Sequence, residues 1–310
     1  VLVPMTVKGV TKFAPWGTEG ELAFDIVNTL LPPKDALFPQ TEKMYQYRLR
    51  LQEVEDFAET KTSSKQVIFG IRSCDMKSID CMDDVFLTKT YVDSFYQAKR
   101  EDLTTVAIGC TKVAQACFCD SMGLDPMHAP SADVQLHDIG DAYVVKAQTP
   151  KGEALVELWK PYLTDGEGEP EKVECTLKVD MTNVKDKLMK MFEHEIWEDE
   201  GKKCIGCGTC TFVCPTCYCF DINQQRKGDE GYEFRCWDSC MFSEYTRMAG
   251  GHNPRPSKKE RVRNRFMHKL CYFEDRYGKT LCVGCGRCVA KCPVHLDITR
   301  FIDQVKEVEV

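Results

Sequence analysis

Cys204-Ile-Gly-Cys207-Gly-Thr-Cys210-Thr-Phe-Val-Cys214-Pro215 is the first of two similar runs toward the C-terminal end of the chain. The second is Cys282-Val-Gly-Cys285-Gly-Arg-Cys288-Val-Ala-Lys-Cys292-Pro293. Both have the C-x2-C-x2-C-x3-C-P spacing of two-cluster bacterial ferredoxins, in which the fourth cysteine of each run binds the other cluster. The spacing predicts two [4Fe–4S] clusters, the first held by Cys204, Cys207, Cys210 and Cys292 and the second by Cys282, Cys285, Cys288 and Cys214.

The residues between the cysteines explain this spacing. Three thiolates on one loop must surround one face of a cluster, which requires tight turns. Glycines at 206, 208, 284 and 286 suit such turns and leave backbone N–H groups free to point at sulfur. Each proline keeps the helix that carries the fourth cysteine from extending through the site. The alternative is a zinc site, but structural zinc prefers two C-x2-4-C pairs and needs no third cysteine before Cys-Pro.

Length and composition bound the class of protein. A chain of 310 residues is long enough for two domains, each with its own core. No apolar run approaches the ~18 residues of a membrane span, and the start lacks the pattern of a signal peptide. The net charge of −7 argues against nucleic acid as a partner. The 19 cysteines fit a reducing cytoplasm, in an anaerobe, because cluster thiolates tolerate oxygen poorly.

The N-terminal part has the pattern of an α/β fold. Residues 67–71 and 105–109 are short apolar runs typical of buried strands, and a helical pattern over 76–86 follows the first of them. Residues 135–149 predict a hairpin around Gly140-Asp141. We therefore expect an N-terminal α/β domain over residues 1–201. A ferredoxin-like domain with two clusters would follow over 202–310, its motifs separated by a long insertion at 215–281.

Two helices are expected around the cluster motifs. Residues 183–200 have the periodicity of one amphipathic helix, with Thr182 placed to cap it. Ser257-Lys-Lys-Glu260 is a capping box that opens a second helix within a basic stretch from His252 to Lys269. Three interpretations of the basic stretch stay open. It is a solvated or partner-facing helix, a source of positive charge beside the clusters, or a nucleic-acid contact.

The remaining cysteines include two groups of four. Cys74 and Cys110 follow the two predicted strands, and Cys117 and Cys119 lie on the next loop, which suits a third iron–sulfur cluster. The alternative for these four is free thiols that pack as small apolar groups. A second group could hold another cluster or only pack beside the first two: Cys217, Cys219, Cys236 and Cys240. Three cysteines look like isolated structural residues: Cys81, Cys175 and Cys271.

Motifs for other cofactors are missing from the sequence. It contains no G-x-G-x-x-G, because Thr211 and Val289 stand where the third glycine would be, and no P-loop. It also has no H-E-x-x-H motif, and its histidines are scattered. We therefore expect that the chain itself binds neither flavin nor NAD.

Several segments resemble the sulfhydrogenase β subunit family, which also includes iron–sulfur subunits of anaerobic sulfite reductase and of flavin oxidoreductases linked to heterodisulfide reductases. The segments that carry the resemblance are Gly70-Ile-Arg-Ser-Cys-Asp75, Cys117-Phe-Cys-Asp-Ser-Met-Gly123, Cys214-Pro-Thr-Cys-Tyr-Cys-Phe-Asp221, Trp237-Asp-Ser-Cys240 and Ala249-Gly-Gly-His-Asn-Pro-Arg255. The resemblance covers roughly residues 65–303. Cys236 departs from the family pattern, which weakens the case for a fourth cluster.

The resemblance implies an electron-transfer subunit of a larger complex. Such a subunit passes electrons from a flavoprotein that oxidises NAD(P)H to a catalytic subunit of the hydrogenase, sulfite reductase or heterodisulfide reductase type. It also implies that Cys74, Cys110, Cys117 and Cys119 hold a third cluster. Whether this chain catalyses a reaction itself stays open, because a cluster with an incomplete set of cysteines could bind substrate at an open iron.

Overall fold

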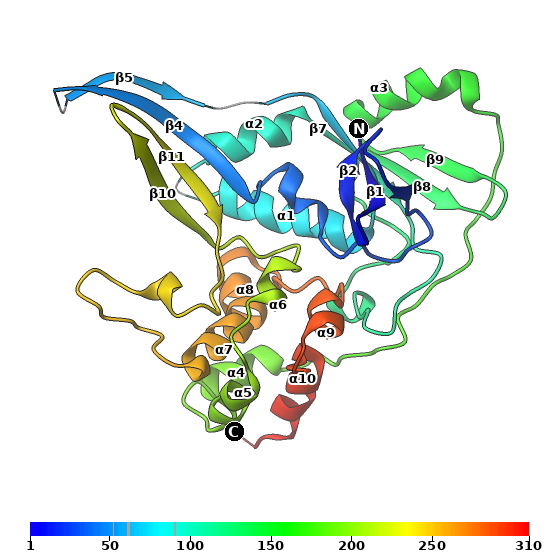
Figure 1. The fold of residues 1–310 in the computed structure, drawn as a ribbon. Helices are drawn as coiled ribbons and strands as arrows, with labels where there is room; N and C mark the ends of the chain where they lie inside the picture. Colours follow the sequence, from blue (N-terminus) through cyan, green and yellow to red (C-terminus); the bar gives the residue numbers. More distant parts are fainter. Residues whose placement is uncertain (52, 61–62, 90, 310) are drawn as a thin grey trace.

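The computed structural model describes residues 1–51, 53–60, 63–89 and 91–309. Figure 1 shows an N-terminal sheet with helices on both faces, a long two-hairpin arm, and a C-terminal group of short helices. The C-terminal helices lie beneath helix α1 of the N-terminal part. This architecture confirms the prediction of a mixed α/β N-terminal sheet followed by the region of the cluster motifs.

The first sheet has seven strands among the described residues, in the order β2–β1–β6–β7–β8–β9, with β3 paired to β1. The strands are β1 (Leu2–Val7), β2 (Val10–Pro15), β3 (Glu21–Leu22), β6 (Gln66–Ile71), β7 (Leu103–Ile108), β8 (Val134–Asp138) and β9 (Tyr143–Ala147). The central pairs β1–β6, β6–β7 and β7–β8 are parallel, and the outer pairs are antiparallel. Strands β6 and β7 therefore end at the same edge, directly before the segments that carry Cys74 and Cys110.

Helices cover both faces of this sheet. They are α1 (Ser73–Leu87), α2 (Ser94–Asp102) and α3 (Pro150–Trp159), with the short 3-10 turns η1 (Pro33–Ala36), η2 (Asp120–Met122) and η3 (Lys160–Tyr162). On one face Ile68 and Ile71 pack against Met76 and Ile79 of α1. On the other face Val106 and Val134 form a core with residues of α3. Alternating strand residues point to opposite faces, so a sheet covered on both sides needs continuous apolar strands.

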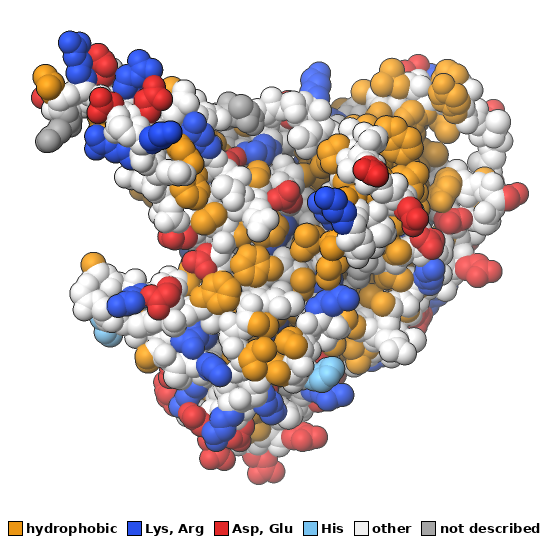
Figure 2. Space-filling model, viewed as in Figure 1, with side chains coloured by type: hydrophobic (Ala, Val, Ile, Leu, Met, Phe, Trp, Pro, Cys, Tyr) orange, Lys and Arg blue, Asp and Glu red, His pale blue; other side chains and the backbone are white. Residues whose placement is uncertain are grey.

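The second sheet joins segments far apart in the sequence. Its strands are β4 (Thr41–Arg50), β5 (Glu53–Glu59), β10 (Phe220–Lys227) and β11 (Glu230–Trp237), and all its pairs are antiparallel. Strand β11, which lies between the cluster motifs, pairs with β4 of the N-terminal part through Phe234↔Lys43 and Cys236↔Thr41. The insertion is therefore anchored on the N-terminal part of the chain. Figure 2 shows that the outer end of this arm carries Lys, Arg, Asp and Glu side chains.

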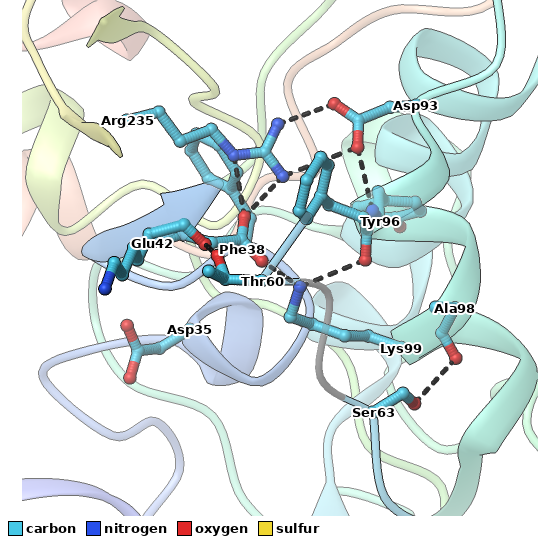
Figure 3. A network of polar contacts seen from close by, with 12 residues as sticks. Asp35, Phe38, Glu42, Thr60, Ser63, Asp93, Tyr96, Ala98, Lys99 and Arg235 are labelled. Carbon is cyan, nitrogen blue, oxygen red and sulfur yellow. Dashed lines mark hydrogen bonds and ion pairs between the residues drawn. The ribbon is translucent and has the colours of Figure 1, made fainter. Parts of the chain in front are cut away.

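A buried ion network fastens the arm to helix α2 (Figure 3). The Arg235 side chain is only 1% exposed, and its guanidinium lies 2.6 Å from a Glu42 oxygen and 2.5 Å from an Asp93 oxygen. Lys99 of α2 also binds Glu42. Asp93 in turn caps α2 by accepting a hydrogen bond from the Tyr96 N–H at 2.8 Å. One network thus connects β11, β4 and α2.

The C-terminal part is built from short helices around a small core. These are α4 (Val184–Lys190), α5 (Ile196–Lys203), α6 (Thr209–Phe212), η4 (Glu244–Thr246), α7 (Lys258–Met267), the π-helical turn η5 (His268–Tyr272), α8 (Phe273–Tyr277), α9 (Arg287–Lys291) and α10 (Ile298–Glu307). Trp197, Phe266 and Phe301 are fully buried at the centre of this core, and their rings contact one another.

Most local predictions are confirmed. Strands β6 and β7, helix α1, the β8–β9 hairpin and the Ser257–Glu260 capping box all form. The single helix predicted over 183–200 is wrong, because α4 ends at Lys190 and α5 begins only at Ile196. The Met191 carbonyl accepts hydrogen bonds from the His194 N–H and the Trp197 indole, which closes a turn between the two helices. The Thr182 cap is also wrong, since Asn183 precedes α4 in a left-handed conformation with no side-chain cap.

Within the described residues, no helix combines the length and apolar character needed to cross a membrane.

The network in Figure 3 predicts a large effect of removing one carboxylate. Glu42→Ala should lower the free energy of unfolding by about 3–5 kcal/mol, because it leaves Arg235 and Lys99 buried with too little negative charge. Urea denaturation under anaerobic conditions, followed through tryptophan fluorescence, measures this change.

Glu230→Ala on the same sheet is the matched control. Glu230 pairs with Arg48 at 3.0 Å, but both side chains are more than half exposed. Its loss should change the free energy of unfolding by at most about 1 kcal/mol. Equal effects of the two variants would contradict the role given to the buried network.

Candidate iron–sulfur sites

The two cysteine loops have the same backbone path. Gly206 and Gly208 have φ values of 73° and 74°, and Gly284 and Gly286 have 63° and 71°. Glycine adopts this left-handed conformation without the penalty that other residues incur. Each pair of turns leads into a short helix, α6 after the first loop and α9 after the second. These two helices pack on each other, which brings the two motifs together.

Backbone N–H groups point at cysteine sulfur, as the glycine spacing predicted. The Gly206 N–H lies 3.3 Å from Cys204 Sγ, and the Leu296 N–H lies 3.2 Å from Cys292 Sγ. The Gly284 N–H makes the equivalent contact with Cys282. Such hydrogen bonds stabilise thiolate ligands and raise the reduction potential of a bound cluster.

The first predicted ligand set surrounds a common space. Cys204, Cys207, Cys210 and Cys292 together line one small hollow, which is also lined by Met241 and Arg265. Cys292 reaches this hollow from the second motif, as the crosswise spacing requires. The donor set therefore fits a [4Fe–4S] cluster. Cys207 is exposed, so this hollow lies near the surface.

The second predicted ligand set is more deeply buried than the first. Burial raises the pKa values of Cys282, Cys285 and Cys288, and the nearby charge of Cys214 raises each of them further. The Cys214 sulfur is thus close to all three cysteines of the second motif. This set also fits a [4Fe–4S] cluster, with the fourth ligand supplied by the first motif.

Two buried cations lie among these sulfurs with no carboxylate partner in the described part of the chain. Lys269 and Arg265 are each 3% exposed. Lys269 Nζ donates to Cys214 Sγ at 3.2 Å and to Thr216 Oγ1 at 3.0 Å. Burial alone would lower the Lys269 pKa, but the negative charge of Cys214 outweighs it and raises the Lys269 pKa well above its usual value. A hydrogen bond from Cys217 holds the pKa of Cys214 itself well below its usual value. Burial likewise opposes charge on Arg265, and negative charge at Cys210 and Cys288 raises its pKa.

The positions of Arg265 and Lys269 favour one of the three interpretations of the basic stretch from His252 to Lys269. Arg265 on α7 and Lys269 on η5 face cysteines of both predicted clusters, as the second interpretation expected. A buried charge needs an opposite charge to offset its desolvation. Here the opposite charge can come only from sulfur among the described neighbours. The π-helical turn that carries Lys269 is a rare conformation often found at functional sites.

A buried ion pair links the second motif to helix α1 of the N-terminal part. The Arg287 guanidinium, from α9, binds Asp75 of α1 through two hydrogen bonds of 2.6 Å and 2.7 Å. Arg287 Nε also donates to the Thr29 carbonyl at 2.7 Å. Both side chains of the ion pair are nearly inaccessible. The pair fixes α9 against the start of the helix that carries Cys74.

The cysteines of the predicted third site lie close together at the edge of the first sheet. Cys74, Cys117 and Cys119 are buried in one small apolar cluster. Burial raises the pKa values of Cys74 and Cys119, and negative charge at Cys110 raises them further. Cys110 therefore lies close to both. The same cluster contains Cys175, which sequence analysis left as isolated. No spacing signal marks Cys175, because it lies on a long segment without regular structure.

The four cysteines of the last group do not come together. Cys236 lies on β11, where it contacts Asn223 at 3.8 Å. Cys217 instead forms a hydrogen bond with Cys214, and Cys219 forms one with Cys240. A hydrogen bond from the Cys240 thiol, together with one from Tyr245, lowers the Cys219 pKa to about 6. The structure therefore separates Cys236 from the other three.

Within the described residues, no three or more His, Cys, Asp or Glu side chains converge closely enough to hold a single metal ion. A [4Fe–4S] cube is wider than one ion, so its ligands stand farther apart.

Comparison with known proteins identifies the family. Residues 203–296 match the family described as a 4Fe-4S dicluster domain. The chain is 31% identical over 315 residues to sulfhydrogenase 2 subunit beta of Pyrococcus furiosus, covering 98% of this chain and 91% of that protein. No solved structure matches the chain. The resemblance seen in the sequence is thus confirmed: the chain belongs to the sulfhydrogenase β subunit family and contains a 4Fe-4S dicluster domain.

Proposed function

We propose that this chain relays electrons within a multisubunit oxidoreductase of the cytoplasm. It accepts them from a flavoprotein subunit that oxidises NAD(P)H and delivers them to a catalytic subunit of the hydrogenase, sulfite reductase or heterodisulfide reductase type. The observation that carries the proposal is the pairing of two complete cysteine sets with two buried cations that have no carboxylate partner among the described residues. The chain itself binds neither flavin nor NAD.

The protein has a limited task in this proposal. Bound [4Fe–4S] clusters supply one-electron chemistry, which makes and breaks no bond in a substrate. Cys204, Cys207, Cys210 and Cys292 would hold the first cluster, and Cys282, Cys285, Cys288 and Cys214 the second. Val213, Leu281 and Val283 each precede or follow a predicted ligand in the chain and are buried, so they would help to keep water away from the sulfurs. Exposed Cys207 places one edge of the first site where a partner subunit can exchange electrons.

The complete sets favour relay over catalysis. A cluster that binds substrate needs an iron without a protein ligand, and each set offers four thiolates for four irons. The third predicted cluster, on Cys74, Cys110, Cys117 and Cys119, would extend the relay into the N-terminal part of the chain.

The first test concerns the source of electrons. The anaerobically purified chain, mixed with NADH alone, should show no bleaching of its visible cluster absorbance. Addition of the flavoprotein subunit from the same complex should bleach it within the time of complex turnover. Bleaching by NADH alone, with flavin bound to the isolated chain, would contradict the proposal.

The second test concerns the buried ammonium group. Lys269→Met should lower the reduction potential of the second cluster, because a positive charge beside Cys214 stabilises the reduced, more negative state. Two unit charges about 5 Å apart at an effective dielectric of about 20 interact by about 3 kcal/mol, on the order of 100 mV for one electron. Redox titration monitored by EPR measures the shift.

Lys202→Met is the control for this test. Lys202 lies on the exposed face of α5, with its side chain 66% exposed. Its replacement should leave both potentials near those of the unchanged protein. An unchanged potential in Lys269→Met would show that the ammonium group does not act on the second site.

A further inference from the structure

The arm formed by β4, β5, β10 and β11 projects beyond helix α2 (Figure 1). Its base is fixed by the buried network around Arg235, but no helix of the described chain lies over its outer half. Within the part of the chain that the structure describes, β5 makes a substantial contact with β4 alone. An antiparallel sheet commonly packs one face on a core. The outer half of this sheet has no such layer within the described chain.

One face of the arm carries a strip of apolar side chains from two strands, which are Tyr45, Tyr47 and Leu49 of β4 and Val54 and Phe57 of β5. Residues two positions apart on a strand share a face, which groups the three side chains of β4. Phe57 pairs with Tyr47 and Val54 pairs with Leu49, so both residues of β5 join that face. Val54 and Phe57 are an odd number of positions apart, and the shift in the β4–β5 pairing between them keeps both on one side.

This apolar strip begins at the core and continues into solvent. The Tyr45 ring meets the buried Phe95 ring of α2 edge-on, with centroids 5.7 Å apart. Phe57 stacks on Tyr45 with centroids 5.2 Å apart, yet Phe57 is 60% exposed. Val54 is 62% exposed. A contiguous apolar surface that folding leaves exposed is typical of a site where another molecule binds.

Negative charge lines the outer strand of the arm. Strand β5 ends the sheet order β10–β11–β4–β5, and its sequence contains no Lys or Arg but four acidic residues, Glu53, Glu55, Asp56 and Glu59. Arg50 pairs with Glu55 at 3.4 Å, whereas the other three make no ion pair with a described residue. Charges on an edge strand prevent it from pairing with a like-charged edge. A second copy of this chain would bring two acidic edges together, so a molecule that covers the apolar strip must carry Lys or Arg side chains alongside β5.

The buried network in Figure 3 holds this surface in one orientation. Arg235 of β11 and Glu42 of β4 are joined to Asp93, the residue that caps α2. The base of the arm therefore cannot turn against α2 without breaking buried ion pairs. A surface fixed before binding loses little conformational freedom when a partner binds, which lowers the free-energy cost of association.

We propose that the apolar strip and the acidic edge of β5 form a docking surface for a partner subunit that presents an apolar patch bordered by Lys and Arg. Val54 and Phe57 are the apolar anchors of this contact. The unpaired carboxylates of β5 pair with the basic side chains of the partner. The inference rests on the proposed function only in taking the partner to be a subunit of the same oxidoreductase complex.

Photo-crosslinking in the whole complex tests what binds the arm. The full-length chain with Val54→p-benzoylphenylalanine is purified anaerobically in its complex and irradiated, and mass spectrometry locates the linked peptide. The expected product joins position 54 to an apolar segment of another subunit that is flanked by Lys or Arg. A product that joins two copies of this chain, or no product, would overturn the proposal.

The affinity of the chain for the rest of its complex tests the anchors. Phe57→Ser should weaken association by about tenfold or more, the loss typical of a buried aromatic anchor, as measured by sedimentation of the anaerobic complex at a series of dilutions. Val54→Ser should weaken it in the same direction while the Tyr45–Phe57 stack stays in place. Leu158→Ser on α3 is the matched control, because Leu158 is 72% exposed but far from the arm in sequence, and it should leave association unchanged.

The dependence of association on salt tests the acidic edge. Replacing Glu53, Asp56 and Glu59 by their amides should weaken association at low salt and reduce its sensitivity to added salt, because exposed charges are screened by ions. Iron content equal to that of the unchanged chain shows that each variant still folds around its clusters.

Unchanged affinity in both Phe57→Ser and Val54→Ser would overturn the proposal, and so would an amide variant with the original salt dependence. The relay is tested separately. A complex that assembles through the arm but whose clusters are not reduced through the flavoprotein would count against the proposed function and leave the docking surface in place.

Discussion

A single buried contact, Lys269 Nζ to Cys214 Sγ at 3.2 Å, connects much of what the structure shows. Removing an ammonium group from water costs several kcal/mol unless an opposite charge replaces the lost hydration. Lys269 has Arg265 as a second buried cation nearby, so the negative charge of the surrounding sulfurs must serve both. Cys214 is the residue that the crosswise spacing assigns to the second cluster. The electrostatics of the core and the ligand pattern therefore lead to the same site.

Two further sets of buried ion pairs connect the cysteine-rich region to the rest of the chain. The Arg287–Asp75 pair joins the second motif to helix α1, and the Arg235–Glu42–Asp93 network joins the insertion to strand β4 and helix α2. Both are buried, so both depend on complete pairing. Together they make the N-terminal part and the cluster region structurally dependent on each other. A rigid connection of this kind keeps the distances between redox centres constant.

Local chemistry could be predicted from the sequence, and contacts between distant segments could not. The glycine turns, the capping box at Ser257 and strands β6 and β7 follow from short-range preferences that act within a few residues. The pairing of β11 with β4 and the approach of Cys175 to Cys119 depend on how separate segments pack, and no spacing rule encodes them. The break between α4 and α5 was missed for the same reason, since the Trp197 indole competes for the Met191 carbonyl only once the turn has formed.

The central claim is that each cluster takes three ligands from one motif and its fourth from the other. Anomalous scattering at the iron edge from anaerobic crystals of the chain, or of its complex, locates the irons directly. The account predicts one iron cluster bonded to Cys204, Cys207, Cys210 and Cys292, and another bonded to Cys282, Cys285, Cys288 and Cys214. A cluster held by all four cysteines of one motif, or a site occupied by zinc alone, would contradict it.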